Sequence, residues 1–60
     1  MIFTEPSIAA QMAFYLEVSK DDIQFLESAF GVDHCTIEAN GTWFDVFFDG
    51  TGMVTEYLHA

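Results

Sequence analysis

Basic residues are almost absent from this sequence. Lys20 is the only Lys or Arg, whereas ten residues are Asp or Glu, and the formal net charge is −9 at pH 7. Nucleic acids and anionic membranes are bound through Lys and Arg side chains, so we expect neither as a direct partner. The carboxylates also have almost nothing to pair with inside the chain, which favours a partner that is itself basic.

Cysteine pairs, long apolar runs and clustered metal ligands are missing too. Cys35 is the only cysteine, so an internal disulfide is impossible and a reducing, cytoplasmic location is expected. No apolar stretch approaches the roughly 20 residues that span a bilayer, and no basic segment resembles the start of a signal peptide. His34 and Cys35 would point to opposite faces of a strand, so we expect no metal site and no other cofactor.

Hydrophobic residues, in contrast, are plentiful. They make up 52% of the 60 residues and include seven Phe, two Tyr and one Trp. Such a composition indicates a folded chain rather than a disordered one. The length allows one small acidic domain, residues 1–60, without room for an enclosed active-site cleft. We therefore expect a protein that is not an enzyme.

Residues 4–18 are predicted to form a first helix. Thr4 is a reasonable N-cap, and Ile8, Met12 and Leu16 recur at helical spacing to make one apolar stripe.

Residues 19–30 are predicted to form a second helix, which would complete a helical hairpin. Ser19 and Asp22 match a capping-box pattern, and Gly31 is suited to the position just after a helix. One apolar face of this predicted helix would carry Ile23, Leu26 and Phe30.

From Asp33 onward the apolar period changes to two, which predicts β-strands. The segments "DHCTIEA" and "TWFDVFF" flank Asn40-Gly41, a strong signal for a two-residue hairpin turn that sets Ala39 opposite Thr42. This register predicts five further pairs: Cys35 with Val46, Ile37 with Phe44, His34 with Phe47, Thr36 with Asp45, and Glu38 with Trp43.

A third strand is predicted after "DGTG", and its register depends on the length of the loop. A longer loop would bring Glu56 into the core, so we choose Gly50-Thr51 as a two-residue loop. That choice predicts three pairs: Trp43 with Leu58, Asp45 with Glu56, and Phe47 with Val54. The predicted fold class is α+β, with an N-terminal helical hairpin followed by a three-stranded antiparallel meander (ααβββ).

The candidate site is the face of this sheet that pairs acids with large rings. Asp45 directly opposite Glu56 would be destabilising, since like charges across a strand pair repel; such a pair suggests a binding role. Asp33 and Asp49 are ordinary turn residues, but they lie around the same patch. The candidate partner-binding residues are Glu38, Asp45, Glu56, Asp49, Asp33, Trp43 and Phe47; no residue is assigned a catalytic role.

Two interpretations of the apolar residues on this face remain open. They are either covered by the segment Met1-Ile2-Phe3 or a helix, which is the commoner arrangement, or exposed as a surface for a partner. If exposed, they bind another protein or form the seam of a homodimer. We expect a monomer.

The whole chain resembles the small phage-encoded anti-CRISPR proteins in size, acidity, scarcity of Lys and Arg, and mixed α/β layout. These proteins share no common motif, so no residue role is transferred. The resemblance implies a non-enzymatic inhibitor in the cytoplasm of an infected bacterial host. It would act as a nucleic-acid mimic on the DNA-binding or PAM-binding site of a Cascade-type complex or a Cas9-like nuclease. The alternative is a small self-associating interaction module without mimicry.

Overall fold

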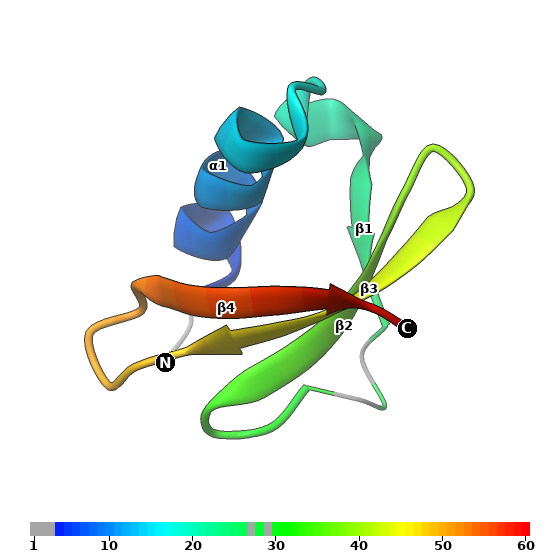
Figure 1. The fold of residues 1–60 in the computed structure, drawn as a ribbon. Coiled ribbons are helices and arrows are strands. Elements are labelled where there is room, and N and C mark those ends of the chain that lie inside the picture. Colours follow the sequence, from blue (N-terminus) through cyan, green and yellow to red (C-terminus); the bar gives the residue numbers. More distant parts are fainter. Residues whose placement is uncertain (1–3, 27, 29) are drawn as a thin grey trace.

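One helix packs on one face of a four-stranded antiparallel sheet in the computed structural model of this protein, which describes residues 4–26, 28 and 30–60 (Figure 1). The strands follow one another across the sheet in the order β1-β2-β3-β4. The elements are α1 (Thr4–Leu16), a 3-10 turn (Lys20–Asp22), β1 (Ile23–Phe25), β2 (His34–Ala39), β3 (Thr42–Phe48) and β4 (Val54–His59). The predicted α+β class is confirmed, whereas the helical hairpin and the three-stranded sheet are wrong.

Helix α1 begins and ends close to the predicted positions. Ile8 and Met12, two residues of the predicted stripe, are fully buried against the sheet. The helix ends where Glu17 adopts a left-handed conformation with φ 59°. The amide of Val18 then donates to the carbonyl of Ala13 at 3.1 Å, which satisfies a carbonyl of the last turn as in a Schellman motif.

The predicted second helix is replaced by one 3-10 turn and the edge strand β1. Ser19 does act as an N-cap, because its Oγ accepts a hydrogen bond from the amide of Asp21 at 3.2 Å. The helix does not continue, however, and Ile23 and Phe25 pair with Ala39 and Ile37 of β2. Two positions of the predicted helix, 27 and 29, lie outside the described residues.

The apolar pattern of this segment fits two periods, which explains the error. Ile23, Leu26 and Phe30 match a helical stripe, but Ile23 and Phe25 also alternate with the polar Gln24. Pairing with β2 buries Ile23 in the core and supplies ladder hydrogen bonds to the segment. Tertiary pairing therefore overrides a local preference for helix.

The β2–β3 hairpin matches the prediction at every pair from His34↔Phe47 to Ala39↔Thr42. Asn40 and Gly41 have φ values of 53° and 85°, the left-handed values that a type I′ turn requires. Cys35, Ile37 and Val46 consequently point into the core, where they are buried.

The predicted β3–β4 register is wrong. The observed pairs are Phe44↔His59, Asp45↔Leu58, Val46↔Tyr57, Phe47↔Glu56 and Phe48↔Val54, with a register shift between Phe47 and Phe48. The predicted pairs Trp43 with Leu58, Asp45 with Glu56 and Phe47 with Val54 are therefore not formed. Tyr57 lies on the core side, and its ring stacks on Tyr15 of α1 at 5.8 Å between centroids.

The loop before β4 and its contact with α1 account for this register. Gly52 takes the left-handed position with φ 87°, so the turn is longer than the predicted Gly50-Thr51 loop. Gln11 of α1 then donates to the carbonyl of Gly52 and accepts from the amide of Val54, both at 2.7 Å. The Gln11 side chain thus pairs with backbone groups at the irregular start of the β3–β4 pairing. These two hydrogen bonds hold the start of β4 against α1.

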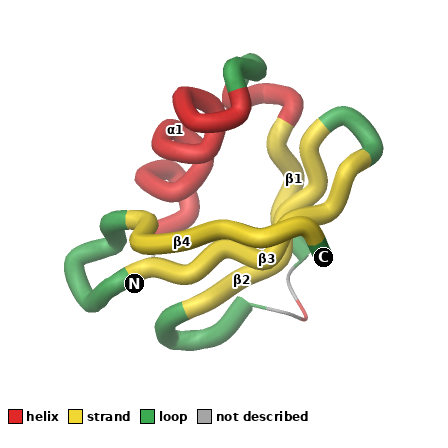
Figure 2. The backbone as a smooth tube through the Cα atoms, viewed as in Figure 1, coloured by secondary structure: helices red, strands yellow, loops and turns green. Residues whose placement is uncertain are grey.

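The core lies between α1 and the sheet (Figure 2). It consists of Ile8, Met12, Ile23, Cys35, Ile37, Ala39, Phe44, Val46 and Phe48. Within the part of the chain that the structure describes, no helix is long and apolar enough to cross a membrane.

Cys35 is a buried thiol in this core. Burial, with a smaller contribution from the charge of Glu5, raises the pKa of the Cys35 thiol to about 11. The folded protein keeps the thiol protonated, whereas the unfolded chain loses the proton near the ordinary pKa of cysteine, about 8.5.

We therefore expect Cys35 to resist alkylation by iodoacetamide at pH 8 and to react promptly after addition of denaturant. Stability should also fall as the pH rises from about 9 toward 11, because the folded state binds the proton more tightly than the unfolded state. Mass spectrometry of the alkylated protein measures the first effect, and denaturant titration at several pH values measures the second. Rapid alkylation of the folded protein would contradict the burial of Cys35.

Candidate functional site

The side of the sheet turned away from α1 is termed the open face. Because side chains alternate along a strand, the observed registers place the following residues on it: Gln24, His34, Thr36, Glu38, Trp43, Asp45, Phe47, Glu56 and Leu58. Among the described elements no helix lies over this face, and Trp43, Phe47 and Leu58 are 46%, 36% and 50% exposed. The segment Met1-Ile2-Phe3, predicted as one possible cover, lies outside the described residues.

Three predicted site residues form a row that crosses the open face. Asp45 lies in β3, between Trp43 and Phe47 on the same face. Glu38 of β2 is paired with Trp43, and Glu56 of β4 is paired with Phe47. The three carboxylates therefore follow a diagonal, termed the acidic diagonal, in which neighbouring positions are about 7–8 Å apart. Asp45 and Glu56 are diagonal neighbours, not the directly opposed pair that the sequence predicted.

Apolar side chains lie along both sides of the acidic diagonal. In the observed register Trp43 and Leu58 lie on one side, and Phe47 lies on the other. The sequence had predicted Trp43 and Phe47 as site residues; Leu58 joins them through its pairing with Asp45. The face thus combines charge with half-exposed apolar surface.

Two members of the acidic diagonal are held in place by local hydrogen bonds. Asp45 Oδ1 accepts a hydrogen bond from Thr36 Oγ1 at 3.0 Å, and Glu38 Oε2 accepts one from the amide of Gly41. Each bond occupies one oxygen of its carboxylate, so the second oxygen can accept a hydrogen bond from a partner. Glu56 is exposed at the edge strand β4.

Asp49 is placed apart from this row, in the loop between β3 and β4. Its Oδ1 accepts hydrogen bonds from the hydroxyl and amide of Thr51 at 2.6 and 2.9 Å and from the amide of Met53 at 3.0 Å. These bonds, the Thr51 hydroxyl foremost, lower the pKa of Asp49. The ionised carboxylate of Asp49 therefore stabilises the loop. This stabilisation is lost as the pH falls and the carboxylate becomes protonated.

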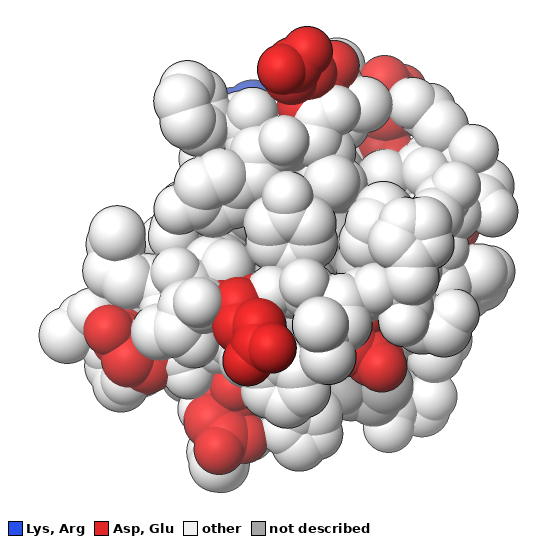
Figure 3. All heavy atoms as spheres, viewed as in Figure 1, with Lys and Arg blue, Asp and Glu red and all other residues white. Residues whose placement is uncertain are grey.

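Asp33 precedes β2 and contacts its neighbour. Asp33 Oδ1 lies 2.9 Å from His34 Nδ1, a contact that is an ion pair only when the His34 ring is protonated; no other ion pair is found among residues 4–26, 28 and 30–60. Figure 3 shows carboxylates at several separate places on one side of the molecule, with only a small area of Lys at its upper edge. The negative charge of the chain is thus left largely uncompensated within the described structure.

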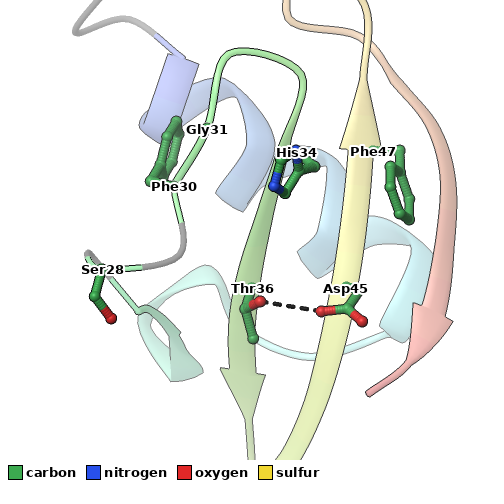
Figure 4. A pocket seen from close by; sticks show the side chains of 7 residues that line it. All are labelled: Ser28, Phe30, Gly31, His34, Thr36, Asp45 and Phe47. Atoms are coloured by element: carbon green, nitrogen blue, oxygen red, sulfur yellow. Dashed lines mark hydrogen bonds between the residues drawn. The ribbon is translucent and has the colours of Figure 1, made fainter.

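A hollow of about 550 Å³ opens on the open face beside Asp45 (Figure 4). Its lining comes from the loop before β2 and from β2 and β3, namely Ser28, Phe30, Gly31, His34, Thr36, Asp45 and Phe47. The sequence had not predicted this hollow, because Ser28, Phe30 and Gly31 were assigned to the end of a helix. A side chain at position 31 would crowd His34, because a Cβ at Gly31 would lie 2.8 Å from Cε1 of His34.

In the described part of the chain, no group of three or more His, Cys, Asp or Glu residues is placed to hold a metal ion. Comparison with protein-family models, with curated proteins and with solved structures finds no match to this chain.

Proposed function

We propose that this protein is a non-enzymatic inhibitor that binds a basic nucleic-acid-binding surface of a host defence complex in place of DNA or RNA. The observation that carries the proposal is the acidic diagonal on a sheet face that no described element covers. A CRISPR effector, such as a Cascade-type complex or a Cas9-like nuclease, is the target class that the compositional resemblance suggests.

The charges of the acidic diagonal favour a basic groove as the binding site. Its neighbouring positions are about 7–8 Å apart, roughly twice the 3.4 Å of axis per charge on one nucleic-acid strand. A rigid sheet can therefore hold carboxylates at spacings of the same order as those between charges on a nucleic-acid backbone. Fixed charges of this kind increase the rate of encounter with a basic surface and exclude acidic partners.

The rings beside the diagonal would supply the contact that holds the complex after encounter. Trp43 is 46% exposed and lies next to the acidic row. Aromatic residues that lose their water at the centre of an interface commonly carry much of the binding energy. The combination of carboxylates and exposed aromatic rings on one face supports binding to a protein partner.

This proposal predicts a strong dependence of binding on salt. We expect the affinity for a CRISPR effector to fall steeply as the ionic strength rises, because the Debye length shortens from about 10 Å at 0.1 M to about 3 Å at 1 M. Surface plasmon resonance across a salt series measures the effect on both association and dissociation rates. An affinity that does not change with salt would reject the electrostatic mechanism.

A second candidate function is self-association through the open face, favoured by the exposure of Trp43 and Leu58. Such a dimer would bring two acidic diagonals together, which electrostatic repulsion opposes. Sedimentation at micromolar concentration distinguishes the candidates. A dimer that Trp43→Asp dissociates would support self-association, and a strict monomer would remove it.

A further inference from the structure

The lining of the hollow beside Asp45 includes hydrogen-bond acceptors and contains no Lys or Arg. Asp45 Oδ1 is occupied by the Thr36 hydroxyl at 3.0 Å, which leaves Oδ2 able to accept. His34 Nδ1 contacts a carboxylate oxygen of Asp33 at 2.9 Å. A carboxylate only accepts, so Nδ1 carries the proton and Nε2 is an acceptor while the ring is neutral.

Flat apolar surfaces complete the lining. The rings of Phe47 and His34 are 6.2 Å apart between centroids and inclined by 36°. Phe30 lines the loop side of the hollow, but its ring packs toward the core against Phe25 and Phe48, at 5.8 and 5.9 Å between centroids. The hollow thus offers a carboxylate beside the half-exposed ring of Phe47.

This combination selects a planar organic cation. A metal ion would need more ligands than His34 and Asp45, the two residues of the lining able to coordinate one. An anion would be repelled by Asp45. A guanidinium group is planar, always charged, stacks on aromatic rings and donates paired hydrogen bonds to a carboxylate, whereas the ammonium of Lys is a compact, strongly hydrated charge.

We infer that the hollow binds the guanidinium of an arginine side chain from the partner protein, stacked on Phe47 and hydrogen-bonded to Asp45. The inference rests on the proposed function, because the arginine belongs to the basic surface that the acidic diagonal approaches. It adds a preference for Arg over Lys, which the acidic diagonal alone does not create.

Oligo-arginine and oligo-lysine peptides of equal length provide the test, with affinities measured by isothermal titration calorimetry. We expect the wild-type protein to bind the arginine peptide roughly tenfold more tightly, the size of a well-formed cation–π contact. Asp45→Asn preserves the Thr36 hydrogen bond and removes the charge, and Phe47→Leu preserves apolar bulk and removes the ring. Both variants should lose most of the preference.

Glu56→Gln is the matched control, since it removes one charge from the same face without touching the hollow. It should weaken both peptides equally and leave the preference unchanged. Thermal unfolding shows whether each variant is folded. If Phe47→Leu is unfolded, the preference for arginine is judged from Asp45→Asn alone.

Three results would overturn the inference in distinguishable ways. Equal affinity for the two peptides, with both weakened by Glu56→Gln, would reject the arginine site and leave the proposed function intact. A preference for arginine that survives Asp45→Asn would also reject the site. Absence of binding to either peptide would contradict the proposed function together with the inference.

Discussion

The triple variant Glu38→Gln, Asp45→Asn, Glu56→Gln is expected to bind the basic partner roughly 10- to 100-fold more weakly than the wild-type protein. Exposed ion pairs contribute about 0.2–1 kcal/mol each, and close pairs within an interface contribute more. Three pairs in the upper part of this range, at about 0.5–1 kcal/mol each, amount to about 1.5–3 kcal/mol, and each 1.4 kcal/mol is about tenfold in affinity. The amides retain the acceptor oxygens used by Thr36 and Gly41, so the local hydrogen bonds can persist.

A second triple variant makes the control for this experiment. Glu17→Gln, Asp21→Asn and Asp22→Asn change the net charge by the same amount at exposed positions between α1 and β1, away from the open face. This variant should bind almost as tightly as the wild-type protein. If the two triple variants lose the same affinity, net charge rather than the acidic diagonal is responsible.

Ile37→Ala is expected to leave most of the protein unfolded at 25 °C. Ile37 is 0% exposed in the middle of β2, paired with Phe25 on one side and Phe44 on the other. Replacing a buried Ile by Ala costs about 2–5 kcal/mol. A core of this size rarely supplies more than about 3–5 kcal/mol of net stability, so one cavity is enough to shift the equilibrium.

Circular dichroism during urea titration measures this loss. Val32→Ala is the control, because Val32 is 93% exposed and its truncation should change stability by less than about 0.5 kcal/mol. A cooperative transition of Ile37→Ala at the wild-type midpoint would contradict the packing described for the core.

The hairpin of β2 and β3 could be predicted because its signal is local. Asn40-Gly41 favours one turn type, and the turn type determines every pair along both strands. The placement of Glu38, Trp43, Asp45 and Phe47 on one face therefore followed from the sequence. These residues form the centre of the candidate site.

The strands at the two sides of this hairpin depend on contacts between distant residues. β1 exists because Ile23 and Phe25 pair with β2, a pairing that a local helical stripe conceals. The register of β4 depends on Gln11, more than 40 residues away, which binds backbone groups of Gly52 and Val54. A period-two pattern specifies the faces of a strand but not the length of the loop before it.

The same limit applies to the candidate site. Glu56 lies on the predicted face, yet its place opposite Phe47 instead of Asp45 follows from the bulge and the longer loop. The hollow was not predicted, because Ser28 and Phe30 were assigned to the second helix. In the structure they lie in the loop before β2, which lines the hollow. Sequence periodicity therefore indicated the residue types of the site but not their final geometry.

Competition with nucleic acid is the most direct test of the proposed mimicry. Fluorescence anisotropy of a labelled DNA target bound to a CRISPR effector would be followed as this protein is added. We expect the wild-type protein to displace the DNA and the variant Glu38→Gln, Asp45→Asn, Glu56→Gln to require a much higher concentration to do so. An effector that binds this protein and its DNA together, with neither weakening the binding of the other, would contradict the proposed mimicry.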